Sequence, residues 1–144
     1  MEHKSAWLKY SPEEVAQLMA FNEGYKKYLD NGKTERECIT QTVAEAEAAG
    51  FKNLEDVLAS GEKIKAGDKL YSVTMGKAIS MFVIGKQPME AGMNILGAHI
   101  DSPRVDLKSY PCYEASGMAY LDTHYYGGIK KYQWVAVPLA IHGV

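Results

Sequence analysis

The sequence predicts an α/β fold in which two helices precede a β-hairpin and the strands of a central sheet. Near the amino end, residues 11–32 and 34–50 combine helix-capping residues with apolar residues at helical spacing. From residue 70 onward, short apolar runs alternate with Gly and Pro, a pattern typical of strands and turns. A chain of 144 residues is long enough for one domain with a core. Its composition, 47% hydrophobic and 24% charged, is that of an ordinary globular protein.

The first helix is predicted to begin after Ser11, which is a good N-cap. Pro12 suits the first helical position, and Glu14 completes a capping box. Asn31 and Gly32 are expected to end the helix. One face should be buried, because apolar residues recur at helical spacing at Val15, Leu18, Met19, Tyr25, Tyr28 and Leu29.

The second helix repeats this pattern, with Thr34 as the N-cap and Glu37 closing the capping box. Gly50 is the expected C′ residue, and Phe51 is placed to pack back on the last turn. Asn53 then caps one short turn over residues 54–58. The residues expected to form the buried stripe of the second helix are Ile39, Val43 and Ala46.

The strands are predicted from apolar runs and the breaks between them. Residues 70–75 and 78–84 flank Gly76-Lys77 and predict a β-hairpin. Residues 93–98 are predicted to form the next, buried strand. After Pro103 a short alternating stretch covers 104–108, and Pro111 is expected to break it.

The carboxyl-terminal stretch from Trp134 to Val144 is apolar and strand-like, and no charged residue follows Lys131. Domain termini are normally polar unless they are tied down. We therefore expect either a chain that continues in the natural protein or a strand that pairs with a partner.

His99 and Asp101 form the central candidate site. They follow the predicted strand 93–98, and open α/β sheets place their sites at the carboxyl ends of strands. We interpret His99 as a metal ligand and Asp101 as the carboxylate that fixes its tautomer. A structural His–Asp hydrogen bond explains this spacing at least as well, and one His cannot hold zinc, which takes three or four protein ligands.

Other candidate residues have simpler explanations. Asp122 and His124 would share one face of a strand, although a polar loop before Gly127 is the favoured interpretation. Arg104 suits either an anionic group near a metal or an ordinary ion pair. His142 lies in an apolar run, where a core or interface histidine is more common than a ligand.

Composition excludes several classes of function. A net charge of −2 with scattered basic residues gives no basis for binding nucleic acid or an anionic membrane. The sequence has no apolar run near the ~18 residues of a membrane span and no signal peptide pattern. Cys38 and Cys112 lie far apart and lack metal-type spacing, so a reducing cytoplasm is the expected location.

The run Gly97-Ala-His-Ile-Asp-Ser-Pro103 closely resembles the G-A-H-T-D-S-P stretch of the aspartyl aminopeptidase family. The resemblance extends over about residues 11–144. Besides the two amino-terminal helices, the similar segments are Ala49-Gly50-Phe51, Leu54, Lys69-Leu70-Tyr71, 78–85, Gly92-Met-Asn-Ile-Leu96 and Tyr126-Gly127-Gly128-Ile129.

The resemblance implies a cytoplasmic zinc aminopeptidase that removes amino-terminal residues from peptides. It implies that His99 is a zinc ligand supported by Asp101, and that each complete subunit holds two zinc ions. The other ligands and a glutamate general base would lie downstream in a longer chain. Residues 1–110 would then be the amino-terminal part of an incomplete zinc-peptidase domain, and 111–144 the start of an inserted, β-rich dimerisation domain. The family forms dimer-based homo-oligomers, often dodecamers.

The chain departs from the family after its paired glycines. The best-known members continue with Phe-Asp-Arg-Asp-Leu, whereas this chain has Trp134-Val-Ala-Val-Pro138, so the resemblance does not establish a preference for acidic amino-terminal residues. Two other hypotheses stay open at this point. One is a non-catalytic fragment or assembly module that pairs through its apolar carboxyl end. The other is a small-molecule-binding α/β domain in which His99 and Asp101 are only hydrogen-bonded.

Overall fold

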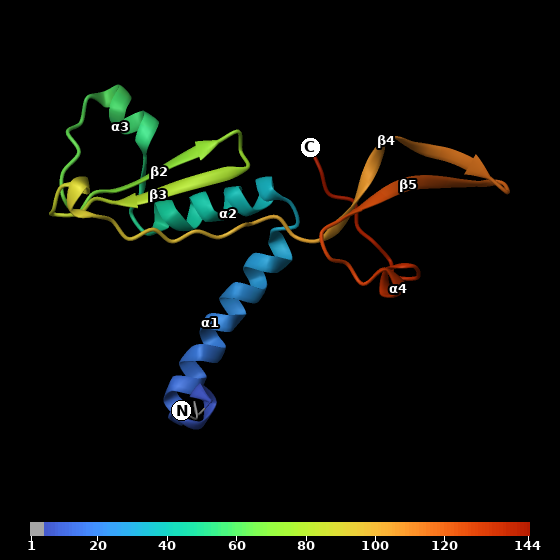
Figure 1. Ribbon diagram of the computed structural model, residues 1–144, viewed down its shortest axis with the longest axis horizontal. Helices are drawn as coiled ribbons and strands as arrows, with labels where there is room; N and C mark the ends of the chain where they lie inside the picture. Colours follow the sequence, from blue (N-terminus) through green and yellow to red (C-terminus); the bar gives the residue numbers. More distant parts are fainter. Residues whose placement is uncertain (1–4) are drawn as a thin grey trace. The chain divides into compact units, whose positions relative to one another are not determined.

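The computed structural model describes residues 5–144 and divides into two compact units, Met1–Leu96 and Gly97–Val144. The first unit contains α1 (Pro12–Asn31), α2 (Glu35–Ala48), β1 (Lys52–Asn53), α3 (Leu54–Ser60), β2 (Lys69–Thr74) and β3 (Ala78–Val83), with 3₁₀ turns at Ala6–Leu8 and Met89–Ala91 (Figure 1). The second unit contains β4 (Arg104–Ala115), β5 (Met118–Tyr126) and α4 (Lys131–Trp134). The predicted mixed α/β class is confirmed.

Both long helices begin with the predicted capping boxes. The Ser11 hydroxyl accepts from the Glu14 amide at 3.2 Å, and the Glu14 carboxylate accepts from the Ser11 amide at 2.8 Å. Thr34 and Glu37 repeat the arrangement at 3.3 and 2.8 Å. These side chains bond amides that have no partner within the helix, which fixes where each helix starts. Gly50 follows α2 with φ +85°, the left-handed cap expected there.

The first unit contains a three-stranded sheet in the order β1-β2-β3. β1 runs parallel to β2, and α3 forms the connection between them. β2 and β3 are antiparallel, with Thr74 opposite Ala78, so the predicted hairpin is confirmed. Met75 and Gly76 form its turn with φ +53° and +66°, which is the left-handed conformation that hairpin turns with matching twist require.

The core of the first unit is small and brings α2, α3 and β2 together. Tyr71 on β2 is 4% exposed, and its hydroxyl donates to the Glu47 carboxylate of α2 at 2.7 Å. Its neighbour Leu70 is also buried. Since successive strand residues point to opposite faces, β2 is covered on both faces. The buried apolar residues are Cys38, Ile39, Ala46, Val57, Leu70 and Tyr71.

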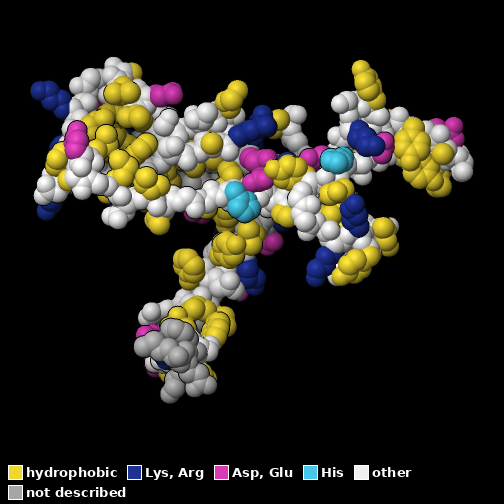
Figure 2. Space-filling view, viewed as in Figure 1, with side chains coloured by type: hydrophobic (Ala, Val, Ile, Leu, Met, Phe, Trp, Pro, Cys, Tyr) yellow, Lys and Arg dark blue, Asp and Glu magenta, His cyan; other side chains and the backbone are white. Residues whose placement is uncertain are grey.

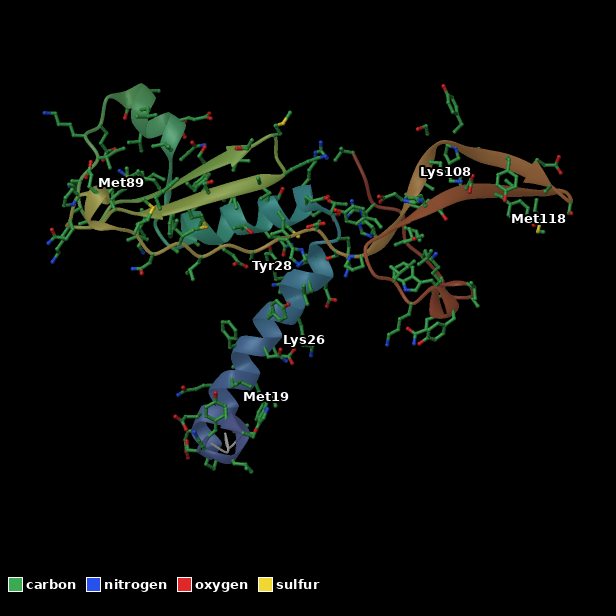
Figure 3. All side chains as sticks on the ribbon, in the orientation of Figure 1. Met19, Lys26, Tyr28, Met89, Lys108 and Met118 are labelled. Atoms are coloured by element: carbon green, nitrogen blue, oxygen red, sulfur yellow. The ribbon has the colours of Figure 1, made fainter. Side chains whose placement is uncertain are left out.

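The prediction that α1 buries one face is wrong. Every residue of α1 is described, and none is buried. Met19, labelled in Figure 3, is 50% exposed, and Phe21 is 79% exposed. The apolar period identifies an apolar face but not the element that would cover it. α1 contacts α2 near its carboxyl end, where the hydroxyls of Tyr28 and Thr42 lie 3.1 Å apart. Within residues 5–144, no helix is both long and apolar enough to cross a membrane.

The predicted strand over residues 93–98 does not form. The segment carries no strand assignment, and Leu96 is fully exposed. A strand exists only through hydrogen bonds to a neighbour, and in the described part of the chain nothing pairs with this run. For the same reason, the strand-like stretch after Trp134 has no regular structure beyond the short helix α4.

The second unit is organised by the antiparallel hairpin of β4 and β5 (Figure 1). Pro111 was expected to end the first strand, but β4 continues to Ala115. The register shifts between Leu107 and Cys112, so the proline lies in an irregular stretch where its missing amide breaks no ladder bond. The predicted domain boundary at 110/111 falls within β4 and stays a prediction.

Candidate metal centre

The His99 ring contacts Asp101 through a single nitrogen. Nδ1 lies 3.0 Å from the Asp101 main-chain oxygen and 3.2 Å from the carboxylate Oδ1. A carbonyl oxygen and an ionised carboxylate only accept hydrogen bonds, so Nδ1 carries the proton. In the neutral ring, Nε2 then keeps its lone pair, which is what a metal ligand requires. The His99 side chain is 83% exposed, so solvent reaches the ring.

Asp101 is held from its other oxygen by Tyr126, the last residue of β5. The Tyr126 hydroxyl donates to Asp101 Oδ2 at 2.6 Å. This hydrogen bond is the main reason why the pKa of Asp101 lies below its usual range. Bonds from its own backbone and from His99 act in the same direction, and burial opposes them. Asp101 is therefore the ionised, accepting partner that the His99 contact needs.

Arg104 is committed to contacts within the second unit. Its Nε donates to Asp106 Oδ1 at 2.8 Å, and Nη1 donates to the Ser102 main-chain oxygen at 3.2 Å. The guanidinium also lies over the Tyr126 ring, 4.2 Å from its centroid. Of the two interpretations of Arg104, the structure supports the ion pair.

Asp122 and His124 lie on β5, so the prediction of a polar loop is wrong. Asp122 forms an ion pair with Lys108 of β4 at 2.9 Å, and the His124 ring stacks on Tyr125 at 5.2 Å. Because the two side chains have separate partners, they do not form a second site. His142 lies in the exposed stretch beyond α4. Cys112 lies on β4, and neither it nor Cys38 forms a disulfide.

The ligand set in this chain is partial. Across residues 5–144, no three His, Cys, Asp or Glu side chains gather closely enough to hold a metal ion. A neutral imidazole with a carboxylate on its other nitrogen has the donor chemistry that zinc takes. His99 thus fits one position of a zinc site that needs further ligands. Sequence reasoning missed Tyr126, which is 25 residues from Asp101 and has no local pattern that links it to the motif.

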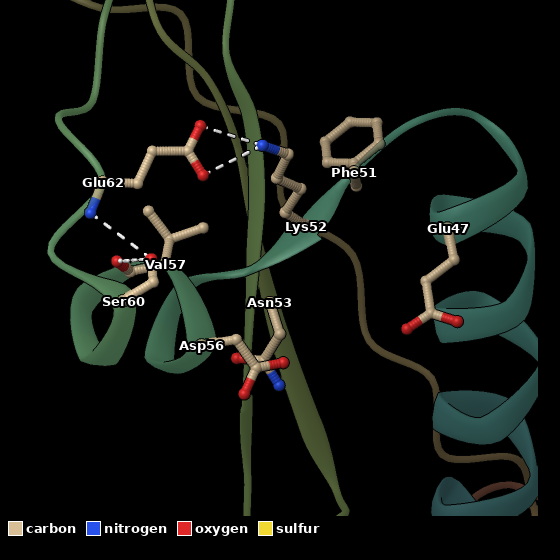
Figure 4. Close-up of a pocket in the computed structure, with 8 residues that line it drawn as sticks. All are labelled: Glu47, Phe51, Lys52, Asn53, Asp56, Val57, Ser60 and Glu62. Carbon is tan, nitrogen blue, oxygen red and sulfur yellow. Dashed lines mark hydrogen bonds and ion pairs between the residues drawn. The ribbon is translucent and has the colours of Figure 1, made fainter.

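An open depression of about 430 Å³ lies in the first unit (Figure 4). Lys52 and Glu62 in its wall form an ion pair at 2.9 Å. Ser60 donates to the Val57 main-chain oxygen. These polar groups satisfy each other, and the lining includes none of the predicted site residues. The depression therefore adds nothing to the candidate site.

Comparisons to known proteins support the fold and identify the family. Residues 28–144 match the aminopeptidase I zinc metalloprotease family (M18). The chain belongs to this family. The predicted family and the incomplete α/β fold are thereby confirmed.

Among its relatives, the probable M18 family aminopeptidase 1 of Clostridium acetobutylicum is 54% identical over 143 residues, covering 99% of this chain and 31% of the relative. Aminopeptidase I from Borrelia burgdorferi B31 superimposes with a TM-score of 0.85 at 38% identity, covering 94% of this chain and 32% of that structure. Aminopeptidase I from C. acetobutylicum gives 0.77 at 52% identity, covering 96% and 30%. This chain thus spans about 31% of the length of such relatives.

Proposed function

We propose that these residues belong to a zinc-dependent aminopeptidase that removes amino-terminal residues from peptides. The contact between His99 Nδ1 and Asp101 in a chain of this family is the observation that carries the proposal. It sets the tautomer in which Nε2 can bind a metal. Zinc, when bound, would supply an acidified water and polarise the peptide carbonyl.

Each of the two residues has a distinct role in this proposal. His99 would bind one of two zinc ions through Nε2. Asp101 would keep the imidazole neutral, oriented and more basic by accepting from Nδ1. The remaining ligands and the general base would come from parts of the enzyme outside these 144 residues. We extend the proposal to a cytoplasmic location, which the lack of a disulfide at Cys38 and Cys112 supports.

We also propose that the enzyme is a dimer-based homo-oligomer, possibly dodecameric, with residues 111–144 in a dimerisation domain. The aromatic side chains of the β4–β5 hairpin support this assignment. Tyr110 is 96% exposed and Tyr113 53% exposed, and apolar side chains are visible on the hairpin surface in Figure 2. Exposed aromatic residues of this kind are enriched at protein interfaces.

The test is substitution of His99 in the complete gene product, read by zinc content and by hydrolysis of a dipeptide. We expect His99→Ala to lose one zinc per subunit and nearly all turnover, and Asp101→Asn to cost roughly 10–100-fold in zinc affinity or activity. His124→Ala is the matched control, because the His124 ring stacks on the Tyr125 ring. Full zinc content and turnover in His99→Ala would refute the assignment.

A non-catalytic assembly module is the second candidate, because within residues 5–144 only His99 is proposed as a zinc ligand. Native mass spectrometry of the purified gene product separates the two hypotheses. Multi-subunit particles with two zinc ions per chain support the enzyme. A zinc-free particle without peptidase activity supports the assembly module.

A further inference from the structure

The segment from His99 to Pro103 has no regular structure, yet it is fixed at two points. Both points lie at the carboxyl end of β5, where Tyr126 is paired with Arg104 across the hairpin. One is the Tyr126 hydroxyl on Asp101, and the other is Gly127 against Pro103. A coil segment keeps a ligand in one place only if such external contacts hold it.

The Tyr126 contact is short and directional. At 2.6 Å, with an ionised acceptor, it belongs to the stronger class of hydrogen bonds. It uses Oδ2, so Oδ1 is left for the His99 ring. The Arg104 guanidinium lies over the Tyr126 ring and is itself oriented by the hydrogen bond from Nε to Asp106.

The Gly127 contact is steric. Gly127 has φ +74°, a left-handed conformation that side chains rarely adopt. A Cβ at this position would come within 3.3 Å of Cα, Cβ and Cγ of Pro103. Glycine therefore allows the backbone after β5 to approach the segment that carries Asp101. The next residue, Gly128, has open space at the same position.

We infer that Tyr126 and Gly127 are positioning residues for the zinc ligand His99. Tyr126 acts through Asp101, and Gly127 acts through Pro103. This inference rests on the proposed function, because it concerns the zinc that His99 would bind. Neither residue is proposed to contact the substrate or the metal. Their effect should therefore appear in zinc affinity and ligand geometry before it appears in overall structure.

The experiment measures zinc affinity of the complete gene product by competition with a chromogenic chelator. Visible absorption of the Co²⁺-substituted protein reports ligand geometry. The variants are Tyr126→Phe and Gly127→Ala. Their matched controls are Tyr125→Phe and Gly128→Ala. The Tyr125 ring contacts the Lys131 ammonium group, which lies 3.8 Å from the ring centroid, and a Cβ at Gly128 would meet open space. Circular dichroism and particle mass establish that each variant is folded.

We expect Tyr126→Phe and Gly127→Ala to weaken zinc binding by about 10-fold and to alter the Co²⁺ spectrum. Loss of a residue that supports a metal ligand typically costs about 10–100-fold in affinity, and we expect the lower end of that range. Both controls should match the wild type. Tyr126→Phe should add little to Asp101→Asn, because residues that act through one contact are not additive. If Gly127→Ala does not fold, Tyr126→Phe decides the matter.

Wild-type zinc affinity and an unchanged Co²⁺ spectrum in Tyr126→Phe would overturn the inference. So would a loss that adds in full to that of Asp101→Asn. These results leave the proposed function intact, since the wild-type enzyme would still bind zinc through His99. If the wild-type protein binds no zinc and cleaves no peptide, the proposed function fails first.

Discussion

Replacing Tyr71 by Phe should lower the free energy of local opening of α2 and β2 by about 1 kcal/mol. The side chain is 4% exposed, and its hydroxyl donates to Glu47 at 2.7 Å. A hydrogen bond to a charged group is worth about 1.5–3 kcal/mol, and one between neutral groups about 0.5–1.5. The lower value applies because Glu47 is exposed and water can replace the lost donor. The phenylalanine ring fills the space of the tyrosine ring, so no large cavity opens.

The assay is native-state hydrogen exchange of the complete gene product, followed on peptides covering α2 and β2. Local exchange is preferred because a single unfolding free energy is poorly defined for a large assembly. Glu47→Gln and the double variant close a mutant cycle. Unchanged protection in both peptides would refute the reasoning, as would a double variant whose loss equals the sum of the two single losses.

This contact also predicts a pH dependence. The hydrogen bond to the Glu47 carboxylate, aided by burial, raises the pKa of Tyr71 above its usual 10.0. A pKa raised by folding means that the stabilisation is complete below pH 10.0 and is lost as pH rises through the folded-state pKa. Tyr71→Phe should remove this alkaline loss of protection. An identical alkaline profile in the variant would contradict the assignment.

Three further substitutions test the first unit, all by hydrogen exchange. Thr34→Ala removes an N-cap and should cost about 1 kcal/mol in the first turn of α2, whereas Thr40→Ala on the exposed face should be nearly neutral. Met75→Asn should stabilise the β2–β3 hairpin by up to about 1 kcal/mol, since Asn tolerates the left-handed φ of +53° and Met75 is 88% exposed; equal or faster exchange would contradict this. Ile39→Ala should cost about 2–5 kcal/mol and Val43→Ala clearly less, because Ile39 is buried and Val43 is half-buried; equal losses would argue against this core.

The parts of the fold that could be predicted are those set by neighbours in sequence. Capping boxes at Ser11 and Thr34 and the turn at Gly76 depend on residues at most four apart, and the structure has all three. The prediction of a strand over 93–98 was wrong because a strand depends on a hydrogen-bonding partner, which no local pattern reveals. The prediction that Pro111 breaks the strand was wrong for a related reason. The register shift that accommodates Pro111 is a property of the pairing with β5.

The candidate site shows the same limit. The contact of His99 with Asp101 spans two residues and was predicted. The role of His99 as a zinc ligand stays a proposal. The contact of Asp101 with Tyr126 spans 25 residues and depends on the strand register of the second unit. In the sequence, Tyr126 appears only within the family-like run Tyr126-Gly127-Gly128-Ile129, because a tyrosine carries no sequence pattern for the carboxylate it will bond.

The distance between Asp101 and Tyr126 along the chain also sets an order of events during synthesis. A ribosome adds about 5–20 residues per second, so the 25 residues that separate them take about 1–5 s to make. A β-hairpin forms in about 1–10 μs once both strands are available. His99 therefore emerges seconds before the residues that fix its surroundings. Until Tyr126 has been synthesised, the segment that carries His99 lacks the contacts that fix it. The rate of elongation, rather than the rate of folding, therefore limits when that segment becomes ordered.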